Sequence, residues 1–278
     1  MRVGRAPETA EIPFYDDAAR GALRRNGLAG QLAAIARLAG PWATPIESWV
    51  DAPYDSAAQA DTYAHVRPAV AHGAFVQLGG SGKDAIKALL GGASRSYLVT
   101  PVKGEAELAR GLACDLGLAD RFEALIGIGE DIPLESSSID ALLSAGSFHH
   151  TDIPQALIEI RRVLRAGGKF AAWDPWHARL YDIGVAVFGK REPGIECRPL
   201  NLARLAELPE IFPDSEIRLH GALTRYPLLA VSKFGLRPPQ RWVHKMTLVD
   251  DRISARVAVL RRNGSSVAVL ATKSADVA

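Results

Sequence analysis

A short apolar run, a glycine-rich turn and a helix-forming stretch follow one another early in this chain and constrain its fold most. Residues 74–78 read AFVQL, residues 79–82 read GGSG, and residues 83–90 read KDAIKALL. The first run has the length and apolar character of a buried strand, and glycine permits the tight turn that follows. The order predicts strand, glycine turn and helix, which is the opening unit of a parallel α/β sheet.

Strand-like and helix-like segments continue to alternate after this unit. Residues 97–101 and 138–144 are predicted strands, residues 160–166 end a helix before two glycines, and residues 169–173 form the next strand. Such alternation predicts a parallel sheet with right-handed crossovers.

Between Val76 and Lys169 these segments resemble the class I S-adenosylmethionine-dependent methyltransferase family. Residues 76–82 resemble its first motif, where an acid precedes a glycine loop around the methionine part of the cofactor. Residues 97–101 resemble the strand whose terminal acid holds the ribose hydroxyls, and residues 127–133 the segment beside the adenine. The resemblance implies a three-layer α/β sandwich with a mostly parallel seven-stranded sheet, Rossmann-like, and S-adenosylmethionine as cofactor.

The chain departs from this family at three acids, which are Gln77, Thr100 and Ile128 here. Charge-assisted hydrogen bonds to a carboxylate contribute about 1.5–3 kcal/mol each. Thr100 offers one neutral hydroxyl instead, and Ile128 accepts no hydrogen bond. We therefore expect S-adenosylmethionine to bind weakly or not at all, with a Kd above about 100 μM. Thr100→Asp combined with Ile128→Asp is expected to tighten binding at least tenfold.

Three interpretations of function stay open at this point, because a fold does not determine an activity. The first is a methyltransferase-family enzyme acting on a small molecule, with a degenerate cofactor site and repurposed chemistry such as cyclisation, isomerisation or elimination. The second is an ordinary S-adenosylmethionine-dependent methyltransferase of a small molecule. The third is a non-catalytic partner subunit.

Ligands of open α/β sheets bind beyond the carboxyl ends of the strands, and the candidate cofactor residues share that location. Glu130 or Asp131 would hold the cofactor if the site is an ordinary one. The candidate cofactor-binding residues are Gln77, Gly79, Gly80, Ser81, Gly82, Thr100, Gly129, Glu130, Asp131 and Ser144.

Four residues after the fourth and fifth strands are candidate catalytic groups, namely His149, His150, Asp174 and His177. A histidine with a pKa near neutrality acts as a general base, and Asp174 or His177 could complete an acid–base set with it. Alternatively, one histidine packs in its loop, the other caps the following helix, and Asp174 begins a turn. The same residues could hold a divalent metal, but we predict none.

The chain divides by this pattern into an N-terminal helical segment, residues 1–72, and an α/β domain, residues 73–278. By resemblance the first is a lid and substrate filter. Within it residues 56–70 form a predicted helix, with Ser56 as N-cap and Gln59 completing a capping box. Amphipathic helices are expected within residues 13–40.

Three further elements are expected after the fifth strand. Residues 180–188 and 202–208 are predicted helices. Residues 254–262 and 265–273 are a predicted β-hairpin around Asn263-Gly264, since Asn-Gly favours the positive φ values of a tight turn.

The composition limits the kinds of partner that we expect this chain to bind. A net charge of +2 over 278 residues gives no electrostatic case for nucleic acid. The two cysteines, Cys114 and Cys197, lack metal-type spacing and fit a reducing cytoplasm. No run approaches the roughly 20 apolar residues of a membrane span, and residues 1–12 do not resemble a signal peptide. We expect a cytoplasmic protein with a small-molecule substrate, no membrane partner, and homo-oligomerisation left open.

Overall fold

The structure is a computed structural model, and it describes residues 55–178, 198–234, 236 and 238–274, together with 12–13, 15–17 and 19–20. The predicted helix at 180–188 and most of the N-terminal segment lie outside the described residues.

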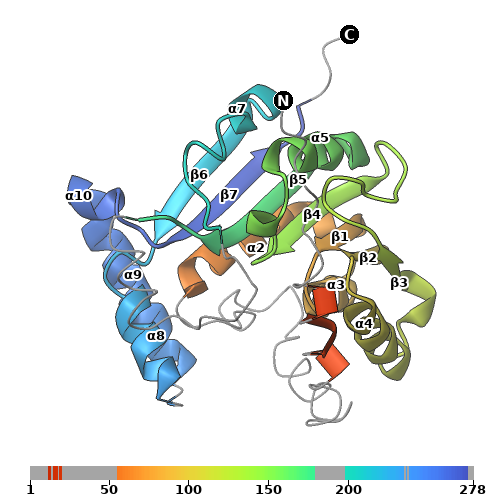
Figure 1. Ribbon diagram of the computed structural model, residues 1–278, viewed down its shortest axis with the longest axis horizontal. Coiled ribbons are helices and arrows are strands. Elements are labelled where there is room, and N and C mark those ends of the chain that lie inside the picture. Colours follow the sequence, from red (N-terminus) through yellow and green to blue (C-terminus); the bar gives the residue numbers. More distant parts are fainter. Residues whose placement is uncertain are drawn as a thin grey trace.

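A seven-stranded sheet forms the centre of the molecule, in the order β3-β2-β1-β4-β5-β7-β6 (Figure 1). The first five strands pair in parallel, and β7 runs antiparallel to both β5 and β6. The sandwich and the mostly parallel sheet are confirmed. The strands are β1 Ala74–Leu78, β2 Arg95–Thr100, β3 Phe122–Ile126, β4 Ile139–Ala145, β5 Leu164–Pro175, β6 Asp214–His220 and β7 Ser266–Thr272.

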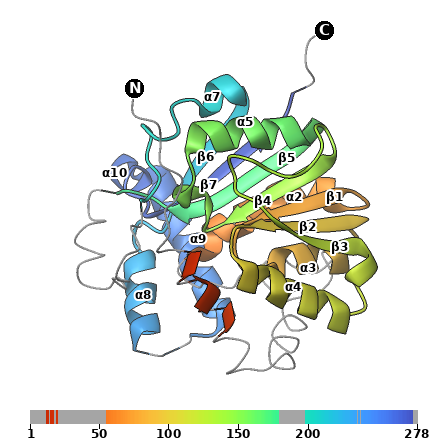
Figure 2. The ribbon, with the colours of Figure 1, turned by 45° about the vertical axis from the view of Figure 1, so that its right-hand side comes forward.

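Helices cover both faces of this sheet, which makes three layers (Figure 2). Because successive side chains of a strand point to opposite faces, each strand feeds two cores. Phe75 packs in the core under α2, α3 and α4, whereas its neighbour Val76 packs in the core under α5 and α7. The helices are α2 Ser56–Val70, α3 Lys83–Leu90, α4 Lys103–Asp115, α5 Ile153–Val163 and α7 Leu208–Ile211.

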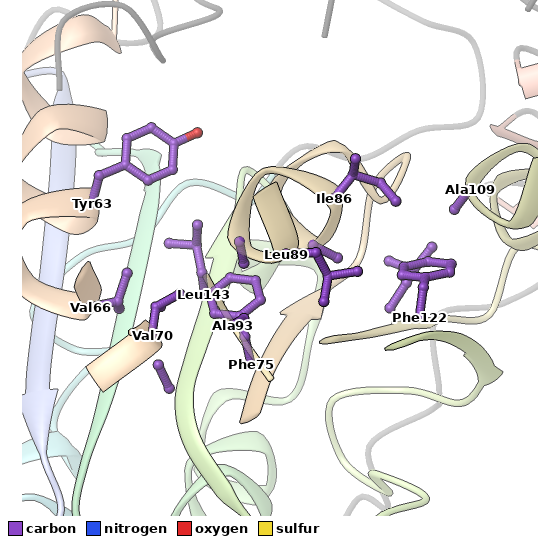
Figure 3. Close-up of a cluster of buried hydrophobic side chains, with 14 of the residues drawn as sticks. Tyr63, Val66, Val70, Phe75, Ile86, Leu89, Ala93, Ala109, Phe122 and Leu143 are labelled. Carbon is purple, nitrogen blue, oxygen red and sulfur yellow. The ribbon is translucent and has the colours of Figure 1, made fainter. Parts of the chain in front are cut away.

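The first core joins α2 to the sheet and to α3. Figure 3 shows Val66 and Val70 of α2 beside Phe75 and Leu143 of the sheet, with Leu89 of α3 next to them. All five side chains are at most 2 % exposed, so α2 is an integral layer of the sandwich.

The helix predicted at residues 56–70 is confirmed, but its predicted cap is wrong. The N-cap is Asp55, whose side chain makes no capping hydrogen bond. Instead the Asp55 carboxylate forms an ion pair with Arg225 of α8, Arg225–Lys233. The Asp55 carboxylate therefore binds a side chain distant in sequence and not a backbone N–H of its own helix.

The predicted β-hairpin is wrong in its first arm. Residues 254–256 end α9, Gln240–Arg256, and α10 occupies Ala258–Arg261. Asn263 donates its backbone N–H to the Leu260 carbonyl at 2.9 Å, so it ends a helical turn instead of joining two strands. The second arm is a strand, β7, and its partners are β5 and β6. Residues 202–207 form turns, and the helix predicted there begins only at Leu208.

A partly buried ionic cluster fixes α9 and α2 to the end of β6. The His220 ring lies 3.0 Å from a carboxylate oxygen of Asp251 on α9 and 3.1 Å from one of Asp61 on α2. Burial by itself would lower the pKa of His220, but the hydrogen bonds to the two aspartates outweigh it and raise that pKa to about 9. His220 is therefore an imidazolium at neutral pH.

The glycine turn after β1 requires glycine at Gly82 for two reasons. Gly82 has a φ of 77°, and a Cβ there would lie 2.6 Å from the Cβ of Ala109 in α4. Residues other than glycine rarely adopt this left-handed backbone conformation. A Cβ so close to Ala109 would also force α3 away from α4. Gly117 also has a positive φ, 66°, but its Cβ would meet nothing within 4 Å.

Candidate functional site

A pocket of about 280 Å³ opens at the carboxyl ends of β1, β2 and β4, where ligands of open α/β sheets bind. The glycine turn, the start of α4, the segment after β3 and the segment after β4 each supply a wall. Its lining residues are Ile12, Tyr15, Leu78, Gly79, Gly80, Val99, Thr100, Pro101, Val102, Glu105, Ile128, Gly129, Glu130, Ala145, Gly146, Ser147, His150 and Thr151.

Five of the predicted cofactor residues line this pocket: Gly79, Gly80, Thr100, Gly129 and Glu130. The other five lie outside its lining. Among these, the Ser144 hydroxyl donates to the Leu78 carbonyl at 3.3 Å, and Asp131 is exposed. Those outside are Gln77, Ser81, Gly82, Asp131 and Ser144.

The side chain of Gln77 holds the glycine turn through two hydrogen bonds. Its side-chain amide donates to the Gly79 carbonyl at 2.8 Å, and its amide oxygen accepts from the Ala85 backbone N–H at 2.9 Å. Both polar ends of this 2 % exposed side chain therefore hold the turn to the first turn of α3. The amide does here what a carboxylate at this position could do only in part, since a carboxylate has no N–H to donate.

The pocket contains a carboxylate that the sequence analysis missed, Glu105. The hydroxyl of the buried Thr100 donates to a Glu105 carboxylate oxygen at 2.7 Å and accepts from the Val102 backbone N–H at 3.2 Å. Thr100 thus does not replace the absent acid itself but positions an acid five residues further on. The signal available in the sequence was an acid in the first turn of the helix after β2.

The surroundings of Glu105 raise the pKa of its carboxyl above the ordinary value of a glutamate. Burial raises the pKa of this carboxyl, the Thr100 hydrogen bond lowers it, and nearby Asp16 raises it. Glu105 also lies in the first turn of α4, where the helix dipole favours a negative charge. A partly desolvated acceptor at a pocket wall is a strong partner for ligand hydroxyl groups.

The wall after β3 is less polar. Ile128 presents an apolar side chain, and a Cβ at Gly129 would lie 2.9 Å from Thr151, so the backbone approaches the next loop closely. The Glu130 carboxylate accepts the Asp152 backbone N–H at 2.6 Å. This wall can pack against a flat apolar ring, with Glu130 as its one charged side chain.

Two of the predicted catalytic residues form a buried pair behind the pocket. The Nδ1 atom of His149 lies 2.5 Å from a carboxylate oxygen of Asp174, and the His149 backbone N–H donates to the same oxygen at 3.3 Å. Asp174 is fully buried, and burial raises its pKa against the lowering effect of His149. Neither residue lines the pocket.

His150 is the histidine that faces the pocket. The centre of its ring lies 3.9 Å from the centre of the His149 ring and 6.3 Å from that of the Tyr15 ring, which stands at 77° to it. Burial, followed by the charges of His149 and Arg204, lowers the pKa of His150 to about 3. It is therefore a neutral imidazole at neutral pH, suited to exchange hydrogen bonds with a ligand.

His177 is not brought to this group. It is exposed, its backbone N–H donates to the Leu200 carbonyl at 2.9 Å, and it does not line the pocket. The helix after the histidines is capped by Asp152, which accepts from the Gln155 N–H. Among the described residues no group of three His, Cys, Asp or Glu side chains could hold a metal ion.

The described part of the N-terminal segment contacts the pocket. Ile12 and Tyr15 contribute to its lining, and Asp16 accepts the Gly104 backbone N–H at 2.5 Å at the start of α4. Across the helices that the structure describes, none is long and apolar enough to cross a membrane.

Comparison with known proteins gives a match to a family model over part of the chain and a likeness of fold over most of it. Residues 77–172 match the family model described as methyltransferase domain. Uncharacterized methyltransferases of Mycobacterium tuberculosis and Mycobacterium bovis are 43% identical over 58 residues, which is 20% of this chain. That stretch spans only 24% of the length of these curated relatives.

Solved structures extend the similarity to the whole chain. The geranyl diphosphate C-methyltransferase of Streptomyces coelicolor A3(2) has a TM-score of 0.59 at 16% identity, covering 97% of this chain and 100% of that one. The cyclase SpnF has a TM-score of 0.57 at 18% identity, covering 98% of both chains. At these identities the likeness shows the fold alone.

Proposed function

Because residues 77–172 match the family model of the methyltransferase domain and lie in a sheet of the same fold class, we propose that this chain binds S-adenosylmethionine and methylates a small molecule. The observation that carries the proposal is the Glu105 carboxylate, held 2.7 Å from the Thr100 hydroxyl on the wall of the pocket. It supplies the acid that the end of β2 lacks.

The pocket offers groups that fit the parts of this cofactor. Glu105 presents acceptor oxygens for a pair of ribose hydroxyls. Val102 and Ile128 give apolar contact for the adenine ring, and the backbone of Gly79 and Gly80 leaves room beside β1. The adenine amino group has no partner in Ile128, so we propose that binding is retained but weakened.

The expected affinity follows from these contacts. The sequence predicts a Kd above about 100 μM with the family acids absent. One recovered charge-assisted contact contributes at least about 1.5 kcal/mol, roughly tenfold. We therefore propose a Kd of about 10 μM or above, with the missing adenine contact still unfavourable.

In the reaction, the cofactor supplies an electrophilic methyl group, and the chain's part is to orient the acceptor molecule. Alignment of the reacting atoms provides most of the rate enhancement in such a transfer. His150 would accept a hydrogen bond from the acceptor through its neutral ring. With a pKa of about 3 it is a weak base, so we assign it to orientation rather than to proton removal. Tyr15 would exclude water above it.

A second candidate function is a repurposed reaction without methyl transfer, such as cyclisation, isomerisation or elimination. It is favoured by Ile128 and by Gln77, whose polar groups are both used within the turn. SpnF, with the same fold, is named a cyclase. In this reading the pocket holds the substrate itself, and His150 with the pair behind it provides the polar groups.

Calorimetry with S-adenosylmethionine, combined with transfer of an isotope-labelled methyl group to a small-molecule extract, tests the proposal. Saturable binding with a Kd of about 10 μM or above, together with label in a small molecule, supports it. Absence of binding at about 1 mM, with conversion of a compound in the same extract without cofactor, supports the repurposed enzyme. Absence of both outcomes supports a non-catalytic subunit.

A further inference from the structure

Helix α9 lies at the edge of the molecule (Figure 1), and it carries a stripe of exposed apolar side chains. Trp242 is 59% exposed, Met246 39%, Val249 51% and Ile253 39%. At 3.6 residues per turn these four positions fall within about 60° of the helix circumference. Their spacing of four, three and four residues is that of the two apolar positions of a heptad. Contiguous exposure of this kind marks an interaction surface, unlike scattered single residues.

A row of basic side chains runs beside the stripe. Lys245, Arg252 and Arg256 are exposed and lie about 70° around the helix from it. The sequence of α9 contains two acids, and both are used internally. Asp250 is 2 % exposed and accepts from the start of α8, and Asp251 contacts His220. The exposed charge of α9 is therefore positive.

We propose that this stripe and the adjacent basic row together bind an acidic amphipathic helix of another protein. Apolar residues of the partner would pack between Trp242, Met246, Val249 and Ile253, and its flanking acids would pair with the basic row, as flanking charges do in paired helices. The stripe is about 17 Å long, so three turns of a partner helix cover it.

Charge argues against a second copy of this chain on the same surface. If two α9 helices packed antiparallel about a two-fold axis, Lys245 of one copy would face Arg252 of the other. Like charges at such positions oppose association.

Geometry argues against a flat anionic membrane. Val243, Thr247 and Ser254 are buried and define the inward side of α9. The basic row lies about 170° from that side, so it faces directly outward, while the apolar stripe faces sideways. A plane would meet mainly the basic row, whereas a helix lying alongside α9 meets both.

The test uses a labelled three-heptad peptide with Leu at the two apolar positions and Glu at the flanking positions, and a twin with Lys in place of Glu. Fluorescence anisotropy should show at least tenfold tighter binding of the Glu peptide to the full chain. Met246→Glu should weaken that binding at least tenfold. Val259→Glu, at a 67% exposed site on α10, is the matched control and should change it less than twofold.

A charge exchange makes the test specific. Lys245→Glu with Arg252→Glu should reverse the preference, so that the Lys peptide binds more tightly. Equal binding of both peptides, or no reversal in the folded double variant, overturns the proposal.

Two further measurements test whether a lipid membrane or a second copy of this chain binds the stripe instead. Suppose that Met246→Glu abolishes co-sedimentation with phosphatidylglycerol vesicles while the Glu peptide does not bind. The surface then belongs to lipid, and the proposal fails. A dimer in sedimentation velocity that Met246→Glu dissociates would assign the surface to a second copy and would overturn it equally. Circular dichroism melts of each variant establish that it is folded.

Discussion

Replacing Glu105 by Gln tests the cofactor site most directly, because it removes the charge and keeps the shape. The amide oxygen still accepts the Thr100 hydroxyl, which lies 2.7 Å away in the native chain. Two ribose hydroxyls would exchange charge-assisted bonds of about 1.5–3 kcal/mol for neutral ones of about 0.5–1.5 kcal/mol. The difference, about 2 kcal/mol overall, corresponds to roughly thirtyfold weaker binding of S-adenosylmethionine.

The assay is calorimetric titration with S-adenosylmethionine, and Glu107→Gln is the matched control. Glu107 lies two residues further along α4, is exposed, and faces Arg20 at 3.5 Å, so its loss should change the Kd less than twofold. Stability should change little in either variant. If Glu105→Gln binds as tightly as the native chain, this carboxylate does not contact the cofactor and the argument for retained binding fails.

The pH dependence gives an independent check on the same residue. Burial raises the pKa of Glu105, so this carboxylate takes up its proton at a higher pH than a free glutamate does. Cofactor binding should therefore weaken on acidification while ordinary glutamates are still charged. Glu105→Gln should lose that acid step, and an unchanged pH profile in this variant would contradict the assignment.

Other predictions concern the turn, the neighbouring threonine and the ionic cluster. Thr100→Asp alone should not tighten cofactor binding, because a second carboxylate beside Glu105 raises the pKa of one of the two. When Thr100→Asp is combined with Glu105→Gln, calorimetry should show that the affinity lost in Glu105→Gln is recovered. Because folding raises the pKa of His220 to about 9, the protonated ring stabilises the fold fully below about pH 6.5. That stabilisation is lost as the pH rises to 9. In urea unfolding at pH 6, the free energy of unfolding of His220→Gln should be about 3 kcal/mol below that of the native chain. Between pH 6.5 and 9 the free energy of unfolding of this variant should stay constant, whereas that of the native chain falls. Gly82→Ala should destabilise the chain by at least about 1 kcal/mol more than Gly117→Ala, since both have positive φ but only the first meets a neighbour. Equal losses in thermal melts would exclude that steric argument.

The local pattern of the sequence was sufficient for four neighbouring strands of the sheet, β2, β1, β4 and β5. Runs such as residues 74–78 and 138–144 are short, apolar and bounded by turn residues, and β1 and β4 lie where these two runs occur. Buried parallel strands carry this signal because both of their faces need apolar side chains. The helix at 56–70 followed from the same reasoning.

The sequence pattern failed where a distant partner decides the local structure. Residues 254–262 alternate well enough for a strand but lie mostly in α9 and α10. The N-cap of α2 is Asp55, whose carboxylate pairs with Arg225, and not the predicted Ser56. Propensity over a few residues is a weak preference that tertiary contacts override.

What the sequence by itself determined is the α/β framework and the edge of the sheet where a ligand would bind, because the succession of strands, glycine turns and helices along the chain follows from local residue patterns. Only the tertiary structure decided which groups meet at that edge. Motif positions alone suggested that the acid after β2 was lost, yet the Thr100 hydroxyl at the end of β2 holds the carboxylate of Glu105, from the first turn of α4, at the pocket wall. Likewise, His149 and His150 are adjacent in sequence but have different surroundings: one is paired with buried Asp174, and the other is a neutral ring at the pocket wall. Burial and hydrogen-bond partners set those differences, and both depend on residues far along the chain.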